Sequence, residues 1–207
     1  ERGSATIAVA GVVASLALAV ALTVMVTSFR EAVTQWLDRV LPADLYARAA
    51  AGGGDTAWVD DALVTKLRAV PGVARAEGQR ATTLQLDPRR PAVALLARPL
   101  ADDPARRLPL LGELLPPRTG ELSVYASEPL ASLYGLHAGT SFDLPLPDGR
   151  RERAFVRAVW RDYARQHGAL ALDAADYRRL TGDTRLNDLA IWLAPGADAG
   201  AVQAQVR

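Results

Sequence analysis

The sequence contains no cysteine, only two histidines, His137 and His167, and a single lysine, Lys66, among its 24 basic residues. The absence of cysteine excludes disulfides, thiol catalysis and thiolate metal sites, and two histidines are too few for a multi-histidine metal centre. We therefore expect neither a metal site nor redox chemistry based on thiols in this chain.

Charge is missing from one long stretch. The 27 residues from Gly3 to Phe29 carry no charged side chain. Glu1, Arg2 and Arg30 account for one acidic and two basic groups, so residues 31–207 hold 22 of each sign and have no net charge. A neutral body lacks the basic footprint of nucleic-acid-binding proteins, and no nucleic-acid partner is expected.

The uncharged stretch is long enough to cross a membrane. As a helix it would extend about 40 Å at 1.5 Å per residue, and a bilayer core needs roughly 20 apolar residues. Its many glycine, alanine and serine residues favour close packing against other membrane helices. A single anchor and a cleaved signal peptide are the alternatives. Arg2 and Arg30 flank the stretch on both sides, so the distribution of charge does not settle its orientation.

The helical pattern continues beyond the apolar stretch. In residues 31–41, Val33, Trp36, Leu37 and Val40 fall on one face of a helix. No proline occurs before Pro42, which would end the helix. The sequence thus predicts one nearly continuous helix over residues 5–41, a transmembrane segment with an amphipathic stalk, and a second region over residues 42–207. Alternatively, residues 31–41 are the first core helix of the soluble domain.

The remainder is expected to form a mixed α/β domain, which gives the whole chain an α+β class, with a second lobe inserted at about residues 80–170. A helix is expected up to Pro71, with Asp55 or Thr56 as its cap. The other helices are expected at Glu128–Tyr134, Ala174–Thr181 and Asp198–Arg207. Strands are expected at Leu45–Ala49, Val73–Gln79, Thr82–Asp87, Ala92–Ala97, Leu122–Ser127, Ser141–Pro145, Arg153–Trp160, Ala169–Leu172 and Leu189–Leu193.

Motifs that carry chemistry are scarce. The sequence has no G-x-x-x-x-G-K-[ST] loop for ATP phosphates and no G-x-S-x-G nucleophile turn. One polar cluster, formed by Arg161, Asp162, Tyr163 and His167, could place a carboxylate beside a histidine base, but a strand end and surface loop explain it better. We therefore predict no catalytic, cofactor-binding or metal-binding residues and no enzyme activity. The pairs Arg89-Arg90 and Arg106-Arg107 are interpreted as solvated loop charges, and contact with membrane lipid head groups is the alternative.

The segment GELSVYASEPLASLYGLHAGTSFDLPLPDGRRERAFVRAVWRDY, residues 120–163, resembles the extracytoplasmic core domain of FtsX/MacB-like permeases of ABC transporters. Members of that family typically have a Ser-Glu pair after a strand, then a short helix over L-A-x-x-x-G-L, then a Gly-Thr or Gly-Asp pair that opens the next strand. In this sequence these places are occupied by Ser127-Glu128, Leu130-Ala131, Gly135-Leu136 and Gly139-Thr140. The resemblance continues through VLPADLYAR (40–48), AVPGVARAEG (69–78) and IWLAPGADAGAVQAQVR (191–207). Within the family, the large ten-helix permeases with two such domains are the most similar.

This resemblance implies a fragment of an inner-membrane permease whose residues 31–207 are periplasmic or otherwise extracytoplasmic. It implies a separate cytoplasmic ABC ATPase subunit that binds ATP, further permease transmembrane helices, and contact with membrane lipids. The domain would couple ATP hydrolysis to export or extraction of a lipid, lipoprotein or peptide-like substrate. The face formed by Val33, Trp36, Leu37 and Val40 is the candidate coupling surface. An anchored extracytoplasmic binding or sensory domain without transport is the alternative function.

Overall fold

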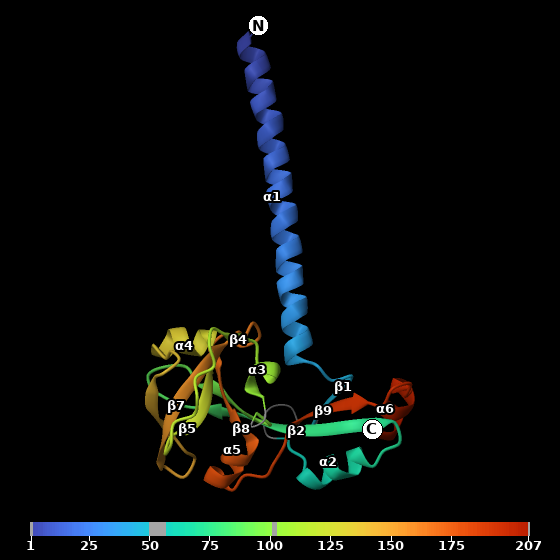
Figure 1. Cartoon of the computed structure of the whole chain (residues 1–207), viewed down its shortest axis with the longest axis vertical. Coiled ribbons are helices and arrows are strands. Elements are labelled where there is room, and N and C mark those ends of the chain that lie inside the picture. The colour runs from blue at the N-terminus through green and yellow to red at the C-terminus, as the bar shows by residue number, and fades with distance from the viewer. Residues whose placement is uncertain (1, 50–56, 101–102, 207) are drawn as a thin grey trace. The chain divides into compact units, whose positions relative to one another are not determined.

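A computed structural model describes residues 2–49, 57–100 and 103–206 (Figure 1). The chain divides into two compact units, Glu1–Leu41 and Pro42–Arg207. Each unit is described below by itself.

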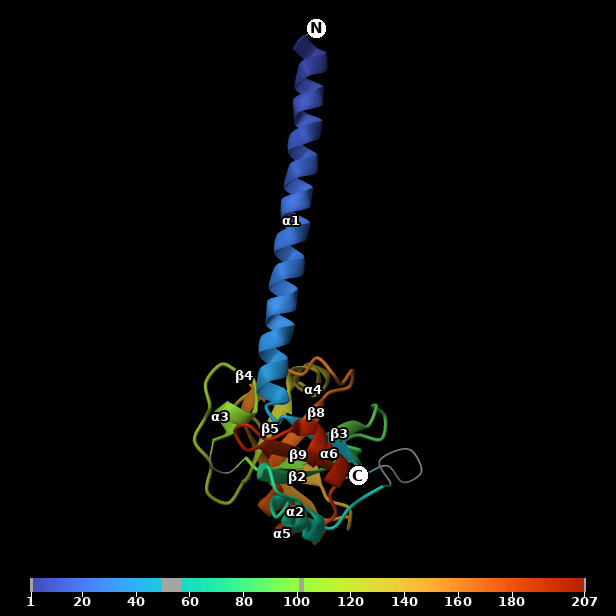
Figure 2. The same cartoon turned by 90° about the vertical axis from the view of Figure 1, so that its right-hand side faces the viewer.

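The first unit is one helix, α1 (Arg2–Val40), drawn as an uninterrupted coil in Figures 1 and 2. The Leu41 amide still donates to the Leu37 carbonyl oxygen at 2.7 Å, and Pro42 follows, as predicted. The hydroxyls of Ser15 and Thr23 donate to carbonyl oxygens four residues earlier, both at 2.8 Å. These two hydroxyls are therefore satisfied inside the helix, as a lipid environment requires.

By length and composition α1 can cross a membrane. Its most apolar window has a mean hydropathy of 2.5, and none of that window is buried within the chain. Large apolar side chains lie exposed along the stretch; Ile7 is 75% exposed and Phe29 is 69% exposed. Leaving such a surface in water would cost about 25 cal/mol per Å², so lipid or other helices must cover it.

The second unit is built on a nine-stranded mixed sheet. Its strands are β1 (Leu45–Arg48), β2 (Val73–Leu84), β3 (Val93–Arg98), β4 (Leu110–Leu111), β5 (Leu122–Ser127), β6 (Ser141–Pro145), β7 (Arg151–Trp160), β8 (Ala169–Asp173) and β9 (Asp188–Leu193). The strand order is β1-β9-β2-β3-β8-β5-β7-β4, and β6 pairs with β7 as a hairpin. The pairs β3/β8 and β5/β7 are parallel, and the other pairs are antiparallel.

Strand β2 corrects one expectation. The sequence pattern indicated two strands, Val73–Gln79 and Thr82–Asp87, whereas the structure has a single strand of 12 residues, drawn as the long green arrow in Figure 1. Its first half pairs with β9 and its second half with β3. Between the two halves, the Asn187 side chain accepts from the Ala81 amide and donates to the Ala81 carbonyl oxygen, both at 2.7 Å. This amide replaces the missing ladder bonds, so the strand runs on without a turn.

Within residues 57–100 and 103–206 the structure has five further helices. They are α2 (Asp61–Arg68), α3 (Pro104–Arg107), α4 (Glu128–Tyr134), α5 (Ala174–Thr181) and α6 (Ala199–Val206). The expected cap of α2 at Asp55 or Thr56 lies outside the described residues, and Asp60 is the N-cap residue instead. Helices α4 and α5 have the predicted bounds, because Ser127 and Asp173 cap them and glycines end them.

The core has three apolar clusters. One gathers residues from 45–76 and 186–206, among them Val64, Leu67 and Ile191. The other two lie on opposite faces of strands β3, β5, β7 and β8, because successive residues, such as Leu95 and Leu96, point to opposite faces and belong to different clusters. Covering both faces explains why β3 and β8 read as near-continuous apolar runs rather than as alternating ones.

The junction between β5, α4 and β8 depends on Ser127. This side chain is fully buried, and its Oγ accepts from the amides of Leu130 (3.4 Å) and Ala169 (2.7 Å). Ser127 is thus the N-cap residue of α4, and the same oxygen also accepts from a strand amide, that of Ala169.

We expect Ser127→Ala to destabilise the domain by about 2 kcal/mol, because it removes a helix cap and leaves the buried Ala169 amide unpaired. Urea unfolding of the chain in lipid nanodiscs would measure the loss. Ser123→Ala, on the same strand, is the control and should change the free energy of unfolding by less than about 0.5 kcal/mol. Equal effects of the two substitutions would contradict the role given to Ser127.

Candidate functional site

The four residues of the predicted coupling surface lie on the last turns of α1. Val33, Trp36, Leu37 and Val40 have helical spacing, so their side chains share one face, and none of the four is buried. Leu37 is 40% exposed. We call these four residues the stalk face. Its apolar character fits contact with a partner helix, and its role stays a prediction.

The polar cluster after β7 has the geometry of a surface loop. The buried Asp162 carboxylate accepts from the Ala164 amide at 3.0 Å and from the Arg165 guanidinium at 3.1 Å. Both partners lie within three residues of Asp162, so its bonds shape the turn, while His167 lies exposed. The interpretation as a strand end and loop accounts for these contacts.

The two arginine pairs differ in how far they are engaged within the domain. Arg107 donates to Glu77 at 2.8 Å, and Arg90 bonds the Leu133 carbonyl oxygen. Arg89 and Arg106 keep side chains that are 90% and 87% exposed. One arginine of each pair is thus directed outward, where a lipid head group could meet it.

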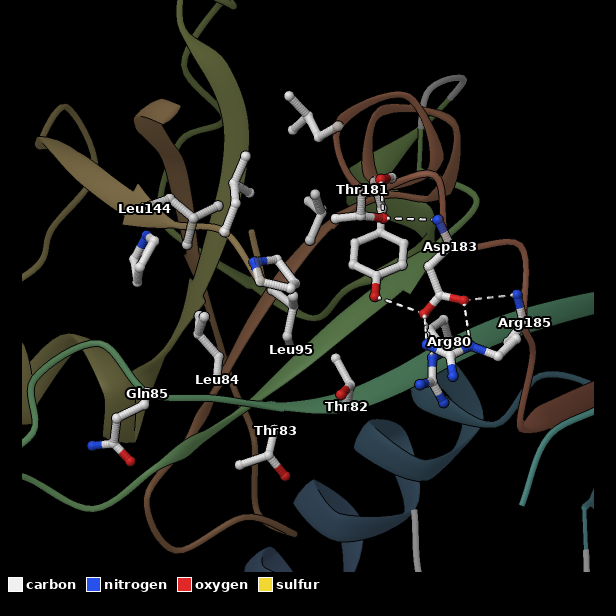
Figure 3. Close-up of a pocket in the computed structure, with 16 residues that line it drawn as sticks. Arg80, Thr82, Thr83, Leu84, Gln85, Leu95, Leu144, Thr181, Asp183 and Arg185 are labelled. Atoms are coloured by element: carbon white, nitrogen blue, oxygen red, sulfur yellow. Dashed lines mark hydrogen bonds and ion pairs between the residues drawn. The ribbon is translucent and has the colours of Figure 1, made fainter. Parts of the chain in front are cut away.

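A cavity that the sequence did not reveal lies against β2, β3 and β8, between α5 and the β6–β7 hairpin (Figure 3). Its volume is about 470 Å³. Leucines from these elements form much of its wall, namely Leu84, Leu95, Leu144, Leu146, Leu172 and Leu180. The Arg150 guanidinium donates to the Leu180 carbonyl oxygen at 2.8 Å and so fastens the hairpin to α5.

Polar side chains gather at one end of this cavity, on the right of Figure 3. The Asp183 carboxylate accepts from Arg80 Nε at 3.1 Å, from the Tyr177 hydroxyl at 3.1 Å and from Arg185 Nε at 2.7 Å. We call these four residues the Arg80–Asp183 cluster. Both Arg80 and Asp183 are nearly buried, with side chains 10% and 9% exposed.

Electrostatics keeps Asp183 ionised. Burial alone would raise the pKa of its carboxyl, but hydrogen bonds from Arg185, Tyr177 and Arg80 hold the pKa well below its ordinary value. Burial, and the charge of Asp183 nearby, raise the pKa of the Tyr177 hydroxyl, which therefore stays protonated and donates. The cluster thus contains two guanidinium ions and one carboxylate, a net charge of +1.

One hydrogen-bond donor of the cluster lacks an acceptor. Arg80 Nη1 is buried and has no hydrogen-bond partner among the described residues. A buried donor without an acceptor costs about 1–3 kcal/mol, so the site is incomplete as it stands. The signal that could have revealed Arg80 is its position: it precedes Thr82 and Leu84 at the alternating spacing of a strand, which places a charge on an inward face.

We expect Asp183→Asn to destabilise the domain by about 2 kcal/mol at neutral pH, because two guanidinium ions lose their counter-charge. The folded-state pKa of Asp183 is lowered, so its contribution is present above pH of about 4, the ordinary value in an unfolded chain, and is lost as the pH falls. The difference between wild type and variant should therefore shrink below pH of about 4. Urea unfolding at several pH values measures it, with the exposed Asp143→Asn as control. A difference that is constant with pH would contradict this account.

No group of three or more histidine, cysteine, aspartate or glutamate side chains is placed to hold a metal within residues 2–49, 57–100 and 103–206. The described residues thus form an apolar cavity with the positively charged Arg80–Asp183 cluster at one end, and an apolar stalk face on α1. A cavity of this kind suits ligand binding, and an apolar helix face suits contact with another helix.

Two solved structures have the same fold as the second unit, Pro42–Arg207. The extracellular domain of the noncanonic ABC-type transporter YknZ from Gram-positive bacteria matches with a TM-score of 0.51 and 9% identity, over 77% of this chain and 86% of that one. The periplasmic region of MacB from Actinobacillus actinomycetemcomitans matches with a TM-score of 0.50 and 10% identity, over 78% of each chain. The second unit therefore has the fold of MacB-like extracytoplasmic domains, as the sequence predicted.

A curated protein extends the similarity to the helix. The chain is 26% identical over 209 aligned residues, 98% of its length, to the uncharacterized ABC transporter permease protein Rv0987 of Mycobacterium tuberculosis. It spans about a quarter, 24%, of the length of that relative. No family model matches the sequence. An apolar helix followed by a domain of this fold fits the expected localisation, in the cell membrane with residues 31–207 on the extracytoplasmic side.

Proposed function

We propose that this chain is a segment of an ABC transporter permease, in which α1 crosses the membrane and the MacB-like domain works outside the cytoplasm. The observation that carries the proposal is that the similarity to an ABC permease covers 98% of the chain, so that helix and domain occur there together. Because that relative is about four times as long as this chain, the complete protein would contain further membrane helices, as in large permeases with two such domains.

In this proposal ATP is hydrolysed by a separate cytoplasmic ABC subunit. The chain supports that division because its sequence lacks a phosphate-binding loop. The domain would act on its substrate or partner without chemistry of its own. Its substrate would be a lipid, lipoprotein or peptide-like molecule that is exported or extracted from the membrane. A binding or sensory domain without transport is the alternative, and the cavity beside Arg80 is the observation that favours ligand binding in either case.

The stalk face would carry movement from the membrane to the domain. Its apolar side chains lie directly before Pro42, where α1 ends and the second unit begins. An exposed apolar face would cost about 25 cal/mol per Å² in water, which favours contact with another permease helix. Because α1 is continuous through the stalk face, a movement of its membrane segment would pass along the helix to this contact.

We expect Trp36→Ala to uncouple ATP hydrolysis from substrate handling in the complete permease with its ATPase. ATPase rate, transport and domain stability should be compared with those of wild type. Gln35→Ala, on the opposite side of α1, is the matched control and should leave all three unchanged. Retained ATP hydrolysis with transport reduced about tenfold would support coupling. Unchanged transport would contradict it, and loss of all three readouts would instead show that the stalk is a structural part of the domain.

A further inference from the structure

We propose that the cavity between α5 and the β6–β7 hairpin binds a single-chain anionic amphiphile, with its aliphatic chain among the leucines and its anionic group at the Arg80–Asp183 cluster. The inference concerns ligand binding by this domain alone. It does not depend on the coupling role of the stalk face, and its test uses no transport measurement.

The apolar part of the cavity suits an aliphatic chain. Leucines from four elements and the intervening hairpin line it, and Figure 3 shows Leu84, Leu95 and Leu144 along its length. Tyr177 is the aromatic residue in the wall, and its hydroxyl is bonded to Asp183. The site therefore offers flexible apolar surface and no pair of rings between which a planar ligand could stack.

The polar end selects the charge of the ligand. Two guanidinium ions face one carboxylate, so an anion is attracted and a cation is repelled. Arg80 Nε is bound to Asp183, whereas Arg80 Nη1 is buried and lacks an acceptor. A carboxylate or phosphate oxygen is the acceptor that a guanidinium binds best, so Arg80 and Arg185, which both line this end of the cavity, are the donors that an anionic head group would meet.

The size of the cavity limits the ligand to a small molecule. A volume of about 470 Å³ lies within the range of roughly 300–1,000 Å³ that small-molecule sites occupy. A hydrogen bond from Arg150 to Leu180 holds the hairpin against α5 and so maintains the walls. The site is thus formed within the domain and needs no second chain to complete it.

Titration of the full chain in zwitterionic lipid nanodiscs with [1-¹³C]decanoate, followed by NMR of the labelled carboxylate, tests the proposal. We expect saturable binding of decanoate, at least tenfold weaker binding of decyltrimethylammonium, and a displaced signal when decyl phosphate competes. A fatty acid as the natural source predicts tighter binding of decanoate, and a phosphate head group predicts tighter binding of decyl phosphate. Equal binding of the cationic and anionic amphiphiles would overturn the proposal.

Variants locate the site. Arg80→Gln should weaken decanoate binding at least tenfold, and Arg48→Gln, which changes an arginine whose side chain is 77% exposed and which does not line the cavity, should leave it unchanged. Thr82→Trp fills the cavity from the half-buried second half of β2 while keeping Arg80, and should abolish binding in a chain that melts as wild type does. Unchanged decanoate binding in Thr82→Trp would place the ligand elsewhere and refute the inference. If Arg80→Gln lowers the melting temperature, Thr82→Trp and the cationic amphiphile decide the question.

Discussion

Trp160→Ala is expected to lower the free energy of unfolding of the extracytoplasmic domain by about 4 kcal/mol. Trp160 is 1% exposed and belongs to the apolar cluster that also contains Leu100, Leu108 and Tyr125. Its indole nitrogen donates to the Tyr125 carbonyl oxygen at 3.3 Å. Truncation would therefore open a large cavity in this apolar cluster and leave that acceptor with one bond fewer.

Urea unfolding of the chain in lipid nanodiscs, followed by near-ultraviolet circular dichroism, measures this effect. Trp58→Ala is the matched control, because Trp58 is 49% exposed, and it should change the free energy by less than about 0.5 kcal/mol. Similar losses in both variants would show that the cluster around Trp160 is not a main source of stability.

Gly168→Ala is expected to destabilise the domain by more than about 3 kcal/mol. Gly168 has φ of +79°, a conformation that disfavours any side chain. An added Cβ would come within 2.4 Å of the Leu130 amide nitrogen and 2.6 Å of Ser127 Oγ, the groups that join β5, α4 and β8. The substitution thus adds a steric clash to the backbone strain.

Gly182→Ala separates these two causes. Gly182 also has a positive φ, of +69°, but a Cβ there meets nothing within 4 Å, so only the backbone term of about 1 kcal/mol remains. Denaturation of both variants under the same conditions gives the comparison. Equal losses at the two positions would mean that the junction at Ser127 yields easily, contrary to its close packing.

Elements with local signals were predictable from the sequence. The bounds of α4 and α5 follow from a capping side chain at one end and a glycine at the other, and both kinds of signal lie within a few residues. The long helix α1 was predictable because uninterrupted apolar sequence and the position of Pro42 define it. In each case the information that fixes the element is contained in the element and its flanks.

Features that depend on distant residues were not predictable. The continuity of β2 through Ala81 requires the side chain of Asn187, which lies 106 positions later in the chain. Helix α2 starts at Asp61 rather than earlier because Val59 is bridged to Leu186, an isolated strand contact. The cavity beside Arg80 is lined by residues from 80 to 185, so its existence depends on tertiary packing that no local pattern records.

The sharing of β2 between two neighbouring strands also determines the order in which the domain can be assembled during synthesis. Strand β9, Asp188–Leu193, lies between β1 and β2, and the cluster around Val64 and Ile191 draws on residues up to Val206. The strands β3 to β8 pair among themselves and are complete once residue 173 has emerged. The middle part of the chain, from β3 to β8, can therefore fold first on the far side of the membrane. The half that contains β1 must wait until β9, Asp188–Leu193, has been translocated.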